Sequence, residues 1–192
     1  MFTHKTNQFE QEIFTIHPGE YYMSQKDIII ATVLGSCISV SLWDLRLAHG
    51  GINHFMLPGN LNGIDMIKSP NAKYGMYAME LLYNELLKAG SRKADIRAKV
   101  FGGASILRMK SGIMTIPQDN IDFALNYLNK EQIPVIARDT GGVQARKIFF
   151  FVKSGKVLLK RIAGSMLKTV SKEEENYLKV IQRRTNDNIT LF

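Results

Sequence analysis

The chain has 192 residues, of which 45% are hydrophobic and 22% charged, and 25 Lys and Arg against 17 Asp and Glu give a formal net charge of +8. This composition is typical of a soluble globular protein and excludes fibrous and low-complexity classes, while a single cysteine excludes an internal disulfide. No apolar run is long enough to span a membrane and the N-terminal residues lack a secretion signal, so we expect a cytoplasmic protein without membrane insertion.

The first half of the chain is dominated by expected strands. Residues 1–18 are polar and are expected to form a loosely held arm that ends at the Pro-Gly pair 18–19. Stretches rich in β-branched and aromatic residues then predict strands over 20–24, 27–34, 37–44 and 51–57. A long loop is expected over 58–73, and long loops in compact domains are often functional or mobile.

The second half adds helices. Apolar residues at helical spacing predict helices over 72–90, 118–132 and 171–184. Further strands are expected over 96–104 and 133–142, and as a hairpin of 145–153 with 156–162. Ser171 precedes Glu174 by three residues, which is the capping-box pattern, so we expect the last helix to begin there.

Strands thus come in runs with helices between them, rather than in strict alternation. This order predicts an α+β fold, with mixed β-sheets packed as a sandwich and helices on the outside, rather than a doubly wound parallel sheet. We expect three parts: an N-terminal arm (1–18), a central domain (19–165), and a C-terminal helix with its tail (166–192).

Cys37 is the single cysteine of the chain and therefore the one candidate for a thiol nucleophile, which needs a nearby base. Of the four histidines, His54 lies in an expected strand with Ile52 and Met56 on the same face. A short connection joins this strand to the strand that begins at Cys37, so the two side chains could meet. The alternative is equally physical: a buried free cysteine is usually inert, and a histidine on an apolar face is usually a satisfied core residue.

Glycines surround the candidate nucleophile. Gly35 and Ser36 precede Cys37, and backbone N–H groups in such a turn could bind a developing oxyanion. Two glycine pairs are candidates to line the substrate mouth: Gly102 with Gly103, and Gly141 with Gly142. The sequence has no phosphate-binding loop and no Cys/His spacing that suits zinc, so no metal site is expected.

The stretches "TVLGSCISVSLWD" (32–44) and "GGINHFMLP" (50–58) resemble the CheD family, the chemoreceptor glutamine deamidases of bacterial chemotaxis. The segments 98–105, 133–142 and 146–162 follow in the family's order, so the resemblance covers about residues 20–162. It implies a sandwich of mixed sheets with outer helices, similar to the cysteine hydrolase fold of cytotoxic necrotizing factor. One departure is Ala145 before Arg146, where family members often carry glycine, and it bears on the local loop conformation.

The resemblance implies a protein-glutamine glutaminase, a hydrolase that converts particular glutamines of methyl-accepting chemotaxis receptors to glutamate and releases ammonia. The nucleophile falls on Cys37, the general base on His54, and the residue that orients the histidine on Thr32. No cofactor or metal is needed for this reaction.

The resemblance also implies partners in receptor adaptation and signal transduction. The cytoplasmic signalling helices of the receptors are rich in Glu and Gln, so a basic enzyme would be drawn toward them. A CheC-type phosphatase is a second expected partner, and the chain could instead act mainly as a non-catalytic adaptor for either. The basic residues are scattered and form no phosphate-binding stripe, so no nucleic-acid partner is expected.

Overall fold

The computed structural model describes residues 2–6, 9–57, 73–106, 116–162 and 165–186, and within them the strands form two five-stranded sheets. The first sheet, sheet A, has the order β1-β2-β4-β9-β10, and the second, sheet B, has the order β3-β6-β5-β7-β8. The strands of sheet A are β1 Phe2–Thr6, β2 Phe9–Thr15, β4 Ile29–Leu34, β9 Ala145–Phe151 and β10 Val157–Ile162. Those of sheet B are β3 Tyr21–Ser24, β5 Ile38–Asp44, β6 His49–Asn53, β7 Ile96–Gly102 and β8 Val135–Thr140.

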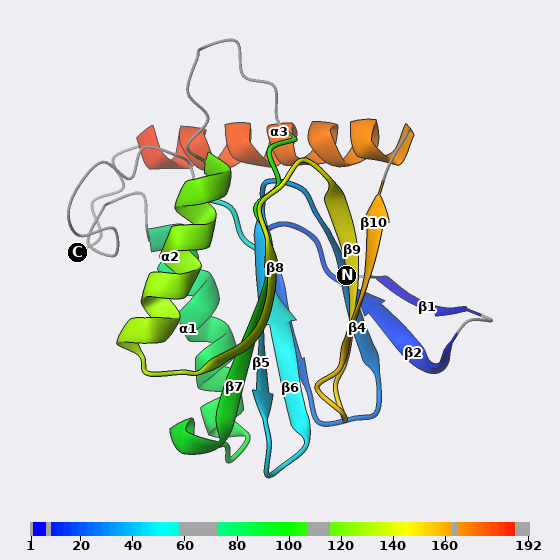
Figure 1. Ribbon diagram of the computed structural model, residues 1–192, viewed down its shortest axis with the longest axis vertical. Helices are drawn as coiled ribbons and strands as arrows, with labels where there is room; N and C mark the ends of the chain where they lie inside the picture. The colour runs from blue at the N-terminus through cyan, green and yellow to red at the C-terminus, as the bar shows by residue number, and fades with distance from the viewer. Residues whose placement is uncertain (1, 7–8, 58–72, 107–115, 163–164, 187–192) are drawn as a thin grey trace.

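Three α-helices and one short 3-10 helix (η2, Lys93–Asp95) complete the described residues: α1 Lys73–Lys88, α2 Ile116–Lys130 and α3 Ser165–Asn186. Figure 1 shows α1 and α2 on the outer face of sheet B, and α3 lying across one end of both sheets. Both sheets contain parallel and antiparallel pairs, because β2 with β4 and β7 with β8 are parallel. The predicted α+β fold with mixed, packed sheets is confirmed.

Alternation along the strands builds two apolar layers. Ile38, Val40 and Leu42 of β5 join the core between sheet B and the helices, as their alternation predicts. A second core lies between the sheets and includes Leu34, Ile148 and Phe150 from sheet A and Cys37, Ile52 and Phe101 from the sheet B side. The site described below lies at one end of this second core.

The N-terminal segment differs from the expected loosely held arm. β2 pairs in parallel with β4, and Ile13 and Ile16 are buried at 0% and 1% exposure. The strand was missed because Glu10 and Glu12 make the segment look polar. In the structure these two side chains are the exposed ones, and the residues between and after them are buried or half-buried. The arm prediction is therefore wrong for β1 and β2, which belong to sheet A.

The last helix also differs. α3 begins at Ser165, so Ser171 lies inside the helix and its hydroxyl bonds to the Glu175 carboxylate at 3.3 Å. The predicted capping box is wrong, because the apolar face that docks the helix extends one to two turns further toward the N-terminus than the acidic run suggests. Leu178 and Ile181 join the core between the sheets, and Val170 packs with Ala145 and Ile162.

Two predicted regions lie outside the described residues: the loop 58–73, except for Lys73, and the tail after Asn186. Within the described residues, none of the helices combines the length and apolar character that a membrane crossing needs.

Candidate active site

The turn Gly35–Cys37 carries the chain from β4 in sheet A to β5 in sheet B. Each of its three carbonyl groups accepts a hydrogen bond. The N–H groups of Gly103 and Ala104 donate to the carbonyls of Cys37 and Gly35, at 2.8 and 2.6 Å. The side-chain amide of Asn120, in α2, donates to the Ser36 carbonyl at 2.8 Å. The turn is therefore fixed by α2 and by the two residues that follow β7.

Three residues predicted from the sequence come together beside this turn. The Nδ1 atom of His54 lies 2.8 Å from the Thr32 hydroxyl oxygen, and that hydroxyl donates to the Ile16 carbonyl at 2.9 Å. Because the hydroxyl has one proton and gives it to Ile16, Nδ1 must carry a proton and donate to Thr32. His54 Nε2 is then the basic nitrogen, and it has no hydrogen-bond partner among the described residues.

Cys37 lies within reach of this imidazole. The Cys37 sulfur, one ring nitrogen of His54 and one carboxylate oxygen of Glu174 all lie within 4.8 Å of one another.

The strand prediction for His54 needs a small correction, since β6 ends at Asn53 and His54 is the next residue. Its backbone is nevertheless fixed, because its N–H donates to the Glu20 carbonyl at 2.9 Å and its carbonyl accepts from Gly19 at 2.7 Å.

Glu174 of α3 is the residue that sequence reasoning missed. One carboxylate oxygen accepts the N–H groups of Gly35 and Cys37, at 2.8 and 3.1 Å. The other accepts the N–H and the hydroxyl of Ser36, both at 2.7 Å. The side chain is 1% exposed. A signal was present: Val170, Glu174 and Leu178 are spaced by four, which puts the acid on the apolar face of the helix.

Burial controls the charge states in this cluster. The pKa of the Cys37 thiol is raised well above its usual value, first by burial and then by the negative charge of Glu174. The pKa of His54 is lowered to about 3, by burial and by the nearby charge of His17. At neutral pH the thiol is therefore protonated and the imidazole neutral.

The two predicted glycine pairs are neighbours, because the Gly141 N–H donates to the Gly102 carbonyl at 2.9 Å. Gly102 and Gly103 support the Cys37 turn: a Cβ on Gly102 would collide with the Cys37 carbonyl oxygen. Gly141 and Gly142 line an open groove of about 850 Å³ between α2 and β8, and the described lining of this groove includes neither Cys37 nor His54. A separate cavity of about 230 Å³ adjoins Thr32, His54 and Glu174 and lies between sheet A and α3.

Cys37, His54 and Glu174 also offer the donor atoms that zinc prefers. However, each carboxylate oxygen of Glu174 already accepts two hydrogen bonds from the turn. These four hydrogen bonds explain how the carboxylate is stabilised in its buried position without a metal ion.

A turn of converging N–H groups beside a cysteine and an oriented histidine is the arrangement of a thiol hydrolase. The family model described as CheD chemotactic sensory transduction matches residues 56–161. Among curated proteins, the probable chemoreceptor glutamine deamidase CheD 1 of Albidiferax ferrireducens is 42% identical over 193 aligned positions, which span 100% of this chain and 80% of that protein. The chain belongs to the CheD family, and the resemblance found in the sequence is confirmed.

Two further relatives show the same breadth of similarity. The probable chemoreceptor glutamine deamidase CheD of Janthinobacterium sp. is 42% identical and is aligned over 91% of this chain and 85% of its own length. The CheD 1 protein of Shewanella oneidensis is 40% identical and is aligned over 96% and 89%. The family-model match begins at Met56, after Cys37 and His54, so the roles of these two residues depend on the geometry described above.

Proposed function

We propose that this protein is a protein-glutamine deamidase that acts on chemoreceptors, as the names of its relatives say of them. The observation that carries the proposal is the buried set of side chains Cys37, His54 and Thr32, which lie in this order beside three convergent backbone N–H groups. A nucleophile, an oriented base and oxyanion donors are the three parts that amide hydrolysis through a covalent intermediate requires.

In the proposed mechanism, His54 Nε2 takes the thiol proton and the Cys37 sulfur attacks the side-chain carbonyl carbon of a glutamine. The oxyanion accepts hydrogen bonds from the N–H groups of Gly35, Ser36 and Cys37, the donors that Glu174 occupies here. The imidazolium then protonates the departing nitrogen, and ammonia leaves a thioester on Cys37. Thr32 holds the ring so that Nε2 faces the reaction.

Hydrolysis of the thioester completes the cycle. His54 removes a proton from water, the hydroxide adds to the thioester carbonyl, and the sulfur leaves and regains its proton. The net reaction turns one glutamine and one water into one glutamate and one ammonia. Since the imidazole carries each proton in turn, the low pKa of His54 in the closed site must rise when the thiolate forms beside it.

The proposed substrates are the cytoplasmic signalling helices of methyl-accepting receptors, and the proposed second partner is a CheC-type phosphatase. With these partners, the proposed location of the protein is the cytoplasm. The net charge of +8 supports the first partner, because helices rich in Glu carry the opposite charge.

The test is mass spectrometry of a receptor cytoplasmic fragment before and after incubation with the protein. We expect wild type to convert specific glutamines to glutamate and Cys37→Ala to convert none. Thr32→Val, which keeps the side-chain shape but loses the hydroxyl, should lower kcat by about 10²-fold while receptor binding is unchanged, because the base is no longer held in its tautomer. Conversion by Cys37→Ala at the wild-type rate would rule out the mechanism.

A second candidate is the non-catalytic adaptor, which the fully buried and protonated thiol favours. An adaptor predicts that wild type binds receptors without releasing ammonia. Binding and signalling that survive in Cys37→Ala would support it.

A further inference from the structure

The carboxylate of Glu174 occupies the donors that the proposed mechanism assigns to the substrate. All three N–H groups of the Gly35–Cys37 turn point at it, together with the Ser36 hydroxyl. One of its oxygens lies within 4.8 Å of the Cys37 sulfur and of a ring nitrogen of His54. A group in this position leaves no room for a second side chain on the same donors.

Glu174 has the chemistry of the reaction product. Deamidation turns a glutamine side chain into a glutamate side chain, and Glu174 is a glutamate whose carboxylate reaches the turn from the surface of a helix. The product of a glutamine on a receptor helix would present the same group on the same kind of backbone. The four donors that stabilise Glu174 would therefore stabilise that product equally.

The rest of α3 docks as a bound ligand helix would. Val170, Leu178 and Ile181 are buried on the same face as Glu174, and all three are at most 6% exposed. Leu178 and Ile181 pack into the core between the sheets, while Val170 packs on Ala145 and Ile162. The aromatic ring of Tyr177 lies against Gly19. Apolar anchors on both sides of Glu174 thus fix the position of its carboxylate.

We propose that α3 is an intramolecular product mimic, which closes the site by placing the Glu174 carboxylate where the carboxylate of a newly formed substrate glutamate would sit. This inference rests on the deamidase function proposed above and adds its regulation: α3 and a receptor helix exclude each other, and substrate enters only when α3 moves away. The protonated state of the closed thiol agrees with an enzyme held inactive, because Glu174 is one cause of that state.

The first test measures access to Cys37, the single cysteine of the chain, by its rate of alkylation with iodoacetamide in the full-length protein. We expect slow alkylation of wild type and at least about tenfold faster alkylation of Glu174→Ala, because the charged side chain that holds α3, and that raises the pKa of the thiol, is gone. Glu175→Ala is the matched control, since Glu175 is exposed on the same helix and should leave the rate unchanged. EDTA in the buffer excludes protection by a bound metal.

The second test asks whether position 174 is the substrate position. Glu174→Gln places a glutamine side chain on the oxyanion donors, so we expect the protein to hydrolyse the introduced amide back to glutamate. Peptide mass spectrometry should find a glutamate at this position in the single variant, and an intact glutamine in the double variant with Cys37→Ala. In the control Glu175→Gln, the introduced side chain is exposed and should remain an amide.

The outcomes separate this inference from the proposed function. If Glu174→Ala is alkylated no faster than wild type although its circular dichroism shows a folded protein, α3 does not close the site. If the amide of Glu174→Gln persists while the same sample deamidates a receptor fragment, the Glu174 carboxylate does not occupy the position of the product carboxylate. If alkylation accelerates but neither this introduced amide nor any receptor glutamine is converted, α3 is a cover and the deamidase function is wrong.

Discussion

A single hydroxyl group decides how the buried histidine is used. Thr32 gives its proton to Ile16, so it can only accept from His54, and the neutral ring therefore carries its proton on Nδ1 and leaves Nε2 unprotonated. The same burial that sets this state makes the imidazolium costly, which is why the pKa of His54 falls to about 3. The residue is therefore linked to folding as well as to the proposed catalysis.

This linkage predicts a pH-dependent stability. The unfolded chain protonates His54 near pH 6.5 and the folded chain near 3, so the contribution of His54 is fully present above 6.5 and is lost as the pH falls toward 3. Between pH 6.5 and 5, the free energy of unfolding should drop by about 2 kcal/mol through this residue. Urea unfolding at both pH values measures it.

His54→Gln is the control for that measurement, because glutamine does not titrate. His49 also has a lowered pKa, mainly through burial, and contributes a loss of its own that both proteins share. The pKa values of Asp44 and Asp95 are lowered from 3.8, so these carboxylates act at more acidic pH. Identical losses in wild type and His54→Gln would contradict the linkage.

At the scale of elements, the site depends on where strands end. The turn from β4 to β5 is held by the end of β7, and the turn from β8 to β9 is held by the buried guanidinium of Arg146. That group donates to the Asp139 carbonyl and carboxylate, at 2.5 and 2.6 Å, and to the Gly141 carbonyl. The loop next to Ala145 is thus closed by Arg146, and Ala145 itself is buried at 0% exposure under α3.

The two glycine turns predict different costs of substitution. Gly102 and Gly142 both have positive φ, at 116° and 75°, so alanine strains the backbone at each. A Cβ at 142 meets no atom within 4 Å, whereas one at 102 collides with the Cys37 carbonyl. Gly142→Ala should cost about 1 kcal/mol of unfolding free energy, and Gly102→Ala at least about 3 with loss of deamidation. Equal costs in urea unfolding would mean that the Cys37 turn can shift.

For the whole molecule, the two sheets meet along one core and the site lies at the end that α3 crosses. Two hydrogen bonds join sheet B to the hairpin of sheet A: the Trp43 indole donates to the Val152 carbonyl at 3.0 Å, and the Lys99 ammonium donates to the Gly155 carbonyl at 2.7 Å.

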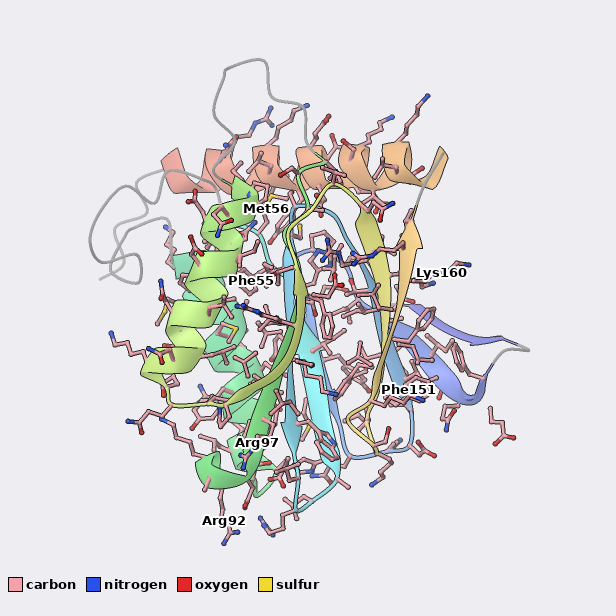
Figure 2. All side chains as sticks on the ribbon, in the orientation of Figure 1. Phe55, Met56, Arg92, Arg97, Phe151 and Lys160 are labelled. Carbon is pink, nitrogen blue, oxygen red and sulfur yellow. The ribbon has the colours of Figure 1, made fainter. Side chains whose placement is uncertain are left out.

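The positive charge is spread over the molecule. Figure 2 shows Arg92 and Arg97 at the end away from α3 and Lys160 on the outer side of β10.

A dispersed net charge of +8 predicts electrostatic steering without a dedicated binding stripe. The association rate with an acidic receptor fragment should fall by about tenfold as the salt concentration is raised from roughly 50 to 500 mM, because the charges become screened beyond a few ångströms. Stopped-flow association measures the rate, and the alkylation rate of Cys37 in the same buffers controls for opening of α3. A rate that is independent of salt would contradict steering.

Local patterns predicted much of this molecule. Each strand and helix expected from the sequence has a counterpart among the described elements, although α3 begins at Ser165 rather than at Ser171. The α+β class followed from the order of these elements. The approach of Cys37 and His54 followed from two strands joined by a short connection. These features depend on neighbours close in the sequence, where alternation and turn chemistry carry the information.

The remaining features depend on distant parts of the chain. Glu174 binds a turn that lies 139 to 137 residues earlier, and a capping pattern at Ser171 offered a local explanation for the same acid. Residues 9–15 needed β4 to become a strand, since polar residues outnumber apolar ones among them. The glycine pairs look alike in the sequence and lie next to each other in the fold, but only packing shows that Gly102 faces the Cys37 carbonyl while Gly141 and Gly142 line an open groove.

The order of elements along the chain gives α3 a consequence in biosynthesis. A ribosome completes both sheets, and with them Cys37, His54 and the oxyanion turn, before it makes Glu174. Because domains begin to fold while they are being translated, a nascent chain can bring Cys37 and His54 together before α3 has docked beside them. The interval before α3 docks is then the time when the cysteine of each new molecule is most open to oxidation or to an untimely reaction.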